Sequence, residues 1–257
     1  MIGPFNLTTN YTTGFLADTF GSEPTFMMPY NPPYYLDLME ACGLRKAKEL
    51  WEWSVPLDGG VPPRLARLTA RLARTTDVRV READASRWYA ESETIRDLYN
   101  RAWQDNWAFM PQRADEFAYV AKDLKPLLSH SVVVLAEAPE GPLGFLLALP
   151  DLNPRMRPLH GSLLSRHTPS LVWSMLTGRG IESCRVALLG VVPEGQRAGI
   201  AALLLGHAFR SPAAAGWRRA TMGWTDPENV DISRTIEAVG GRQSKSFAVF
   251  DTVLEPR

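Results

Sequence analysis

The residues whose types and spacing could support chemistry lie between Leu188 and Leu205. An apolar, β-branched run is followed there by a short polar turn and then by a run rich in Leu and Ala. This pattern predicts a strand that ends at Val191 and Val192, a loop, and a helix. The first turn of a helix has free backbone N–H groups at the positive end of its dipole, so the junction can bind an anion such as pyrophosphate. Arg197 can add a positive charge, and the small residues that allow close approach are Ala198, Gly199 and Ala201.

The residues alone leave a second interpretation open. Many strand–turn–helix junctions bind no ligand, and a single glycine-containing loop is a weak signal. Two better-defined phosphate loops are excluded, because the segment contains neither Gly-x-Gly-x-x-Gly nor Gly-Lys-Ser/Thr.

The loop resembles the acyl-CoA loop of the GCN5-related N-acetyltransferase (GNAT) superfamily. The pattern of that family is Gln/Arg-x-x-Gly-x-Gly/Ala, and Gln196, Gly199 and Ala201 occupy its fixed positions. About thirty residues further on, a second segment resembles the family's next strand and helix. It comprises Trp224-Thr-Asp-Pro-Glu-Asn229, Ile232, Ile236 and Gly240-Gly241.

The resemblance implies an α/β (α+β) GNAT fold. Its sheet is mixed and mostly antiparallel, has helices on both faces, and splays into a V between two parallel central strands, here 185–192 and 218–225. The implied function is transfer of an acetyl group from acetyl-CoA, a co-substrate, to an amine that attacks directly in a ternary complex. The residues that match the cofactor-binding positions are Val191, Val192, Gln196, Arg197, Ala198, Gly199, Ile200, Ala201 and Asn229.

The catalytic residues are less clear from the sequence. Many family members have a tyrosine that protonates the leaving thiolate, but the matching position here is Ile236, and no tyrosine follows Tyr119. Asp151 and Asp226 follow predicted strands and are candidate bases, although each also suits a turn or cap. Asn229 likewise suits a helix N-cap. Trp103, Asn106 and Trp107 could shape an acceptor pocket or belong to the core.

Because Ile236 stands where many family members have a tyrosine, functions other than acetyl transfer are also considered. One alternative is a non-catalytic acyl-CoA-binding or regulatory module. A second is a tandem-lobed transferase that uses another activated donor, such as an aminoacyl-tRNA. The sequence identifies no acceptor beyond a small-molecule or peptide amine.

The composition of the chain limits the classes of partner that we expect it to bind. The chain has 257 residues, with 28 basic and 28 acidic side chains, so its formal net charge is zero. That balance argues against nonspecific nucleic-acid binding. The N-terminus lacks the pattern of an export signal, and no apolar run reaches membrane-spanning length. Cys42, Cys184 and the four histidines show no metal-ligand spacing. We therefore expect a cytoplasmic protein with no nucleic-acid, membrane or metal partner.

The predicted elements from residue 78 onward follow the GNAT order. Strands are expected at 78–81, 131–136, 143–149, 185–192, 218–225 and 244–253, and helices at 84–103, 114–128, 171–176, 199–210 and 229–239. Residues 78–257 are therefore predicted to form a complete GNAT domain. A basic linker helix is expected within 58–77, where arginines follow one helical stripe.

Residues 1–57 are predicted to form half of a second GNAT-like lobe. The segment is predicted to contain a strand over 25–35, a helix over 36–48 and a strand from 49. Shifting it by 197 positions places Glu40-Ala41-x-Gly43-x-Arg45-x-x-Lys48 on Glu237-Ala238-x-Gly240-x-Arg242-x-x-Lys245. This match predicts an internal duplication. A half-lobe leaves a strand edge unpaired, so we expect either a truncated chain or docking onto the complete domain or onto a second subunit in a homo-oligomer.

Overall fold

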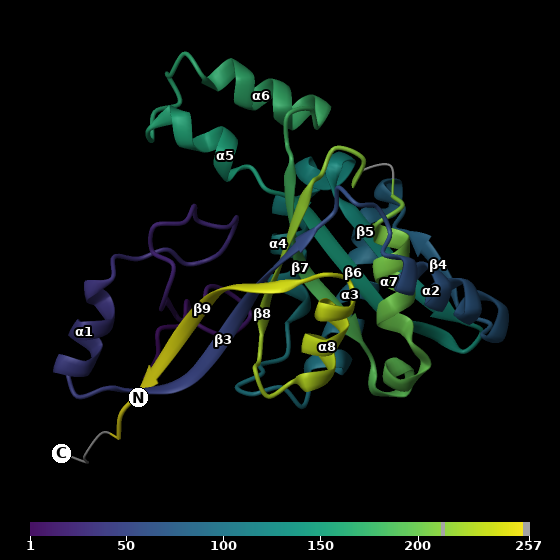
Figure 1. The fold of residues 1–257 in the computed structure, drawn as a ribbon, viewed down its shortest axis with the longest axis horizontal. Helices are drawn as coiled ribbons and strands as arrows, with labels where there is room; N and C mark the ends of the chain where they lie inside the picture. The colour runs from purple at the N-terminus through teal and green to yellow at the C-terminus, as the bar shows by residue number, and fades with distance from the viewer. Residues whose placement is uncertain (212–213, 254–257) are drawn as a thin grey trace.

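One mixed sheet forms the central layer of the molecule (Figure 1). The computed structural model describes residues 1–211 and 214–253. Within them, nine strands are arranged in the order β1-β9-β3-β8-β7-β6-β5-β4, and β2 also pairs with β9. The strands are β1 (Ile2–Gly3), β2 (Phe15–Leu16), β3 (Arg45–Pro56), β4 (Arg79–Glu82), β5 (Val132–Ala138), β6 (Gly141–Pro150), β7 (Ser183–Val191), β8 (Arg219–Thr225) and β9 (Arg242–Asp251). β7 and β8 run parallel, and the other neighbours run antiparallel.

Helices cover both faces of this sheet. On one face, α7 (Ile200–Ala208) packs on the strands and α2 (Pro63–Thr75) packs on α7. On the other face lie α3 (Trp88–Trp103) and α4 (Ala114–Leu124). The remaining α-helices of the described residues are α1 (Tyr34–Ala41), α5 (Asn153–Met156), α6 (Thr168–Thr177) and α8 (Val230–Ala238). The α/β fold class, the mostly antiparallel sheet and the helices on both faces are thereby confirmed.

The alternation of side chains along the strands gives each face of the sheet its own apolar core. In β5, Val132 and Val134 belong to the core under α7, whereas Val133 and Leu135 belong to the core under α3. Successive side chains of a strand point to opposite faces, so a continuous apolar run suits a strand covered on both sides. The centre of the sheet, where the candidate site is built, is therefore packed on both faces.

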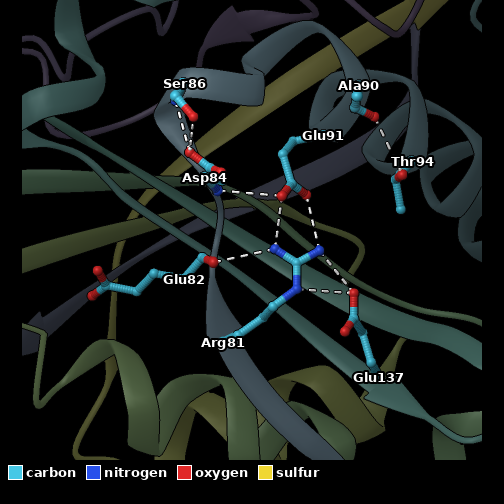
Figure 2. A network of polar contacts seen from close by, with 8 residues as sticks. All are labelled: Arg81, Glu82, Asp84, Ser86, Ala90, Glu91, Thr94 and Glu137. Atoms are coloured by element: carbon cyan, nitrogen blue, oxygen red, sulfur yellow. Dashed lines mark hydrogen bonds and ion pairs between the residues drawn. The ribbon is translucent and has the colours of Figure 1, made fainter.

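A network of charged groups ties α3 to the edge of the sheet (Figure 2). Both terminal nitrogens of Arg81 donate to the carboxylate of Glu91, at 2.8 and 3.0 Å, and its Nε and Nη2 donate to Glu137 at 3.0 and 2.8 Å. The backbone N–H of Asp84 also donates to Glu91, and Asp84 itself caps the turn that begins α3 by accepting from Ser86. Arg81 therefore joins β4, β5 and α3 in one hydrogen-bonded unit.

From residue 78 onward, the predicted elements are present in the predicted order, with ends that differ by a few residues. One such difference is at the helix predicted over 114–128. The α-helix ends at Leu124, and a 3-10 helix, η2 (Lys125–His130), continues the chain. Pro126 accounts for the change, because a proline inside a helix removes a donor and clashes with the preceding turn.

The N-terminal residues contribute to the same sheet. β3 lies between β8 and β9 and pairs with both. The predicted strand over 25–35 is wrong: residues 25–33 form turns and irregular backbone, and α1 follows. The helix predicted over 36–48 is present but ends at Ala41, and residues 45–48 belong to β3. Pro29, Pro32 and Pro33 explain this, since each removes an N–H from a potential strand ladder. The division at 1–57, 58–77 and 78–257 remains a prediction, and the helix α2 lies within the proposed linker.

Candidate functional site

The candidate site lies where β7 leads into α7. Val192 is buried, and its N–H donates to Leu143 O at 2.9 Å, which fixes the end of the strand. A 3-10 helix, η4 (Pro193–Ala198), then turns the chain. Gly199 joins it to α7 with a φ of +73°, a conformation that favours glycine. A Cβ at this glycine would also meet Leu72 of α2 at 2.7 Å.

The N-terminus of α7 is available to an anion. No side chain of the described residues caps it. The first N–H groups of a helix lack intrahelical partners, so those near Gly199, Ile200 and Ala201 can donate to an oxyanion. Gln196 is exposed beside them, Ala198 and Ala201 are half-buried, and Ile200 is buried in the core. The side chain of Arg197 lies outside what the structure describes.

The two parallel central strands splay apart beside this loop. β7 and β8 pair from Ser183 and Arg219 to Val186 and Met222, and the pairing then stops. β7 nevertheless continues to Val191 and β8 to Thr225. The C-terminal half of β7 therefore presents unpaired backbone groups toward the gap, while its other edge pairs with β6. An extended ligand with amide groups could pair with this edge as a strand does.

Asn229 and Ile236 have clear structural roles. The Asn229 side chain caps α8 by accepting from the Ile232 N–H at 3.2 Å, as the N-cap interpretation expected. Ile236 is fully buried in the core beneath α8, and a Cβ at Gly241 would lie 2.3 Å from it. The position that matches the family's tyrosine therefore supplies no polar group to the gap between β7 and β8.

The two candidate aspartates lie at opposite ends of the sheet. Asp226 follows β8, on the same side as the loop, but forms an ion pair with Lys48 at 2.8 Å. Asp151 follows β6 next to Ser183, at the start of β7. The eight residue steps from Ser183 to Val191 span about 26 Å, so the structure does not bring Asp151 to the loop. Burial raises the pKa of Asp151 above its ordinary value, which two hydrogen bonds and a nearby arginine partly offset.

Reasoning from the sequence missed a buried polar cluster beside the splay. It consists of Glu52 on β3, Arg185 on β7, Trp224 on β8 and Lys245 on β9. Arg185 is 6% exposed and donates to the carbonyls of Phe26, Met27 and Gly223. Its guanidinium lies 5.5 Å from the centre of the Trp224 ring. Burial lowers the pKa of Arg185 to about 10, although Glu52 opposes the shift.

Glu52 is the most enclosed charge of this cluster. It is 2% exposed, accepts from the Ser244 hydroxyl at 3.0 Å, and lies 3.6 Å from Lys245 Nζ. Its Oε2, together with Arg185 Nε and Trp224 Nε1, is buried without a hydrogen-bond partner in the described residues. Buried polar atoms are seldom left unpaired, so this concentration marks a place where a ligand or water fits. Trp224 and Lys245 lie in segments that the sequence analysis compared, but no motif joins the four residues, because they come from four strands distant in sequence.

Trp103 packs over the end of β7. A Cβ at Gly190 would lie 2.4 Å from the Trp103 ring, which also stacks on Tyr99 at 4.6 Å between ring centres. Trp107 contacts Phe5 of the N-terminal segment. Trp103 therefore packs against the end of β7 beside the splay, Trp107 packs on the N-terminal segment, and Asn106 lies in the turn between them.

Two cavities lie near the sheet. One of about 60 Å³ lies beneath α7, and its lining includes Val186 and Met222, the last paired residues before the splay. Apolar side chains and the Cys184 thiol line it. A larger cavity of about 770 Å³ opens at the opposite edge of the sheet, near Pro150 and Glu182, and does not adjoin the loop. The smaller cavity borders the last paired residues of β7 and β8, on the face of the sheet that α7 covers.

The fold and the splayed strands define the class of protein: this chain has the fold of the GCN5-related N-acetyltransferase superfamily. A GCN5-related N-acetyltransferase from Sphaerobacter thermophilus superposes with a TM-score of 0.53 at 13% identity, over 85% of this chain and 56% of that one. A tandem GNAT protein from the clavulanic acid biosynthesis pathway gives a TM-score of 0.51 at 12% identity, over 86% of this chain and 59% of that one. No family model matches the sequence.

Two curated proteins are similar along nearly the whole chain. Protein YghO of Escherichia coli is 31% identical over 254 residues, which are 97% of this chain and 64% of that protein. The bacterial ceramide synthase of Caulobacter vibrioides is 29% identical over 257 residues, which are 98% of this chain and 66% of that protein. The chain thus spans just under two thirds of the length of these relatives. None of the described helices has the length and apolar character needed to cross a bilayer.

Proposed function

We propose that this protein transfers an acyl group from acyl-CoA to an amine by direct attack. The observation that carries the proposal is the loss of pairing between β7 and β8 after Val186 and Met222, next to the uncapped N-terminus of α7. The diphosphate would accept hydrogen bonds from the N–H groups at Gly199–Ala201, and the pantetheine arm would pair with the free edge of β7. The same backbone can stabilise the oxyanion that forms at the thioester carbonyl.

The buried polar cluster gives the proposal a group that can accept a proton. The amine nitrogen forms a bond to the carbonyl carbon and loses a proton, the carbon–sulfur bond breaks, and the thiolate takes a proton from water. We assign Glu52 as the acceptor of the amine proton. In support, its Oε2 is unpartnered, and a Cβ at Gly223, just beyond the last β7–β8 pair, would lie 3.2 Å from Glu52 Cα. Asp226 is less suited to this role because Lys48 pairs with it at 2.8 Å, whereas Glu52 lies 3.6 Å from Lys245 and its Oε2 has no partner among the described residues.

We propose the acceptor from the similarity to a curated relative, and the length of the acyl chain from a cavity beside the splay. The similarity to a bacterial ceramide synthase suggests a long-chain amino alcohol as acceptor. The apolar cavity at Val186 and Met222 has a volume of about 60 Å³, so it suits an acyl chain only a few carbons longer than acetyl, because methylene groups gain by leaving water for an apolar surface. Acetyl-CoA remains the donor expected from the sequence. The binding of acetyl-CoA and of a longer acyl-CoA should therefore be compared directly.

A second function is favoured by one observation. Ile236 replaces the tyrosine of many family members and is buried, so the domain could bind acyl-CoA without turning it over. Release of free thiol separates the two functions. We expect release from acyl-CoA when a long-chain amino alcohol is added, and less with a polyamine or a peptide N-terminus. Acyl-CoA binding without release over the whole panel would favour the regulatory module.

A further inference from the structure

A hairpin of short helices projects from one end of the sheet (Figure 1). It joins β6 to β7 and contains α5, a 3-10 helix (Arg157–Leu159) and α6. Its base is fixed, because Leu152, Leu159 and Leu171 are buried and Arg155 Nε donates to Gly180 O at 2.8 Å. We call residues 153–180 the α5–α6 hairpin.

Large apolar side chains point outward from this hairpin. Leu164 is 98% exposed, and Leu163 and Leu176 are each 75% exposed. Val172 and Trp173 are also exposed, so with Leu176 they form the outer side of α6, while Leu171 and Ser174 face inward. The Thr168 hydroxyl donates to Leu163 O at 2.8 Å and orders the tip. Monomeric proteins rarely gather apolar side chains on a projecting surface, which indicates an interaction site.

The charges of the hairpin have one sign. Residues 152–181 contain four arginines and two of the four histidines but no aspartate or glutamate, although the whole chain has equal numbers of acidic and basic side chains. Arg157 pairs with Glu23, which lies outside the hairpin. Arg166 and Arg179 are exposed, and no carboxylate of the described residues forms a salt bridge with them. The partner therefore needs an apolar interior and a negatively charged surface.

We propose that the α5–α6 hairpin docks onto the surface of a bilayer that contains anionic lipids. Leucines and a tryptophan on a basic, helical projection match the composition of elements that lie in the membrane interface. The arginines would meet the lipid phosphates while Leu163, Leu164 and Leu176 enter the acyl boundary. This differs from the expectation that the protein has no membrane partner, which rested on the absence of a spanning segment.

Docking in this way leaves the candidate site open. The hairpin adjoins the start of β7, whereas the loop at 193–198 follows its other end. The proposal does not depend on acyl transfer, so vesicle binding and catalysis can be tested separately.

The test is sedimentation of the full chain with vesicles. We expect binding to vesicles that contain phosphatidylglycerol, weaker binding to pure phosphatidylcholine, and a loss of binding as salt is raised. The triple variant Leu163→Ser, Leu164→Ser, Leu176→Ser should lower the affinity for anionic vesicles roughly ten-fold or more. The double variant Arg166→Gln, Arg179→Gln should reduce the salt dependence.

Two controls are matched to these changes. Leu7→Ser with Tyr119→Ser removes two other strongly exposed large side chains, and Arg67→Gln with Arg71→Gln removes exposed charges from α2. Both should bind vesicles as the unaltered protein does. The proposal is overturned if the unaltered protein does not sediment with anionic vesicles, or if the triple variant binds as well as the controls. A dimer in light scattering that the triple variant disperses, without vesicle binding, would assign the surface to a second copy.

Discussion

Leu50 of β3 is paired with Phe247 of β9, and these two residues are also 197 positions apart, which is the offset of the internal match in the sequence. The pairing is symmetrical about them: Glu49 faces Ala248 and Trp51 faces Ser246. The same offset places α1 on α8 and β3 on β9. Two related helix–strand units would pair in this way about a local two-fold axis, which supports the predicted duplication.

The position of β3 predicts that residues 58–257 do not form a stable domain alone. Removing residues 1–57 would strip β3 from between β8 and β9, leaving long unpaired edges that promote aggregation. We expect the shortened protein to be insoluble or to lack a cooperative thermal transition, and to recover one when residues 1–57 are supplied as a separate chain. A cooperative, monomeric 58–257 would contradict this arrangement.

Glu52→Gln tests the assignment of the proton acceptor. The change keeps the shape of the side chain but removes its basicity, so we expect kcat to fall by about a hundred-fold or more while the KM for acyl-CoA changes little. Both would be measured as thiol release.

Two control variants accompany it. Ser244→Ala removes a neutral hydrogen bond to Glu52, and Asp226→Asn removes the carboxylate paired with Lys48. Both should keep most of the turnover. If Glu52→Gln keeps most of the turnover and Asp226→Asn loses it, the assignment is reversed.

The Arg81 network predicts a loss of stability in acid. Burial alone would raise the pKa of Glu91, but hydrogen bonds from Arg81 and from the Asp84 N–H outweigh it, so the pKa lies below the ordinary value of 4.5. A carboxylate with a lowered pKa stabilises the fold above its unfolded-state pKa, and this stabilisation is lost as the pH falls through the folded-state pKa.

Glu91→Gln should therefore lower the free energy of unfolding at neutral pH by about 1 kcal/mol, a figure reduced because Arg81 is partly exposed. The difference between the two proteins should shrink in urea titrations at progressively lower pH. Glu93→Gln, which changes an exposed carboxylate on the same helix, is the matched control. If the difference in the free energy of unfolding between Glu91→Gln and the unaltered protein stays the same in acid, the Arg81 network is not the source of the lost stability.

The second half of the chain could be predicted well because its signals are local. Gly199, the apolar run before Val192 and the cap at Asn229 each determine structure within a few neighbouring residues. The place of β3 could not be predicted, since pairing between Leu50 and Phe247 depends on two distant segments that meet only in the sheet. The cluster at Glu52 was missed for the same reason.

The turn-forming and catalytic roles of an aspartate also look alike in a sequence. Asp151 and Asp226 both follow strands, and only the direction of those strands shows that Asp151 lies far from the loop. Prolines between Pro29 and Pro33 were a local signal against the strand expected over 25–35, but the aromatic residues around them favoured one.

Calorimetric titration of the full chain with acyl-CoA tests the central claim most directly. We expect saturable binding of acetyl-CoA and of a longer acyl-CoA, with the longer chain bound more tightly. Ala201→Asp should weaken both by about ten-fold or more, because it places a negative charge beside the diphosphate. Ala73→Asp, on the exposed side of α2, should bind normally. No detectable heat and no thermal shift with either ligand would contradict the account.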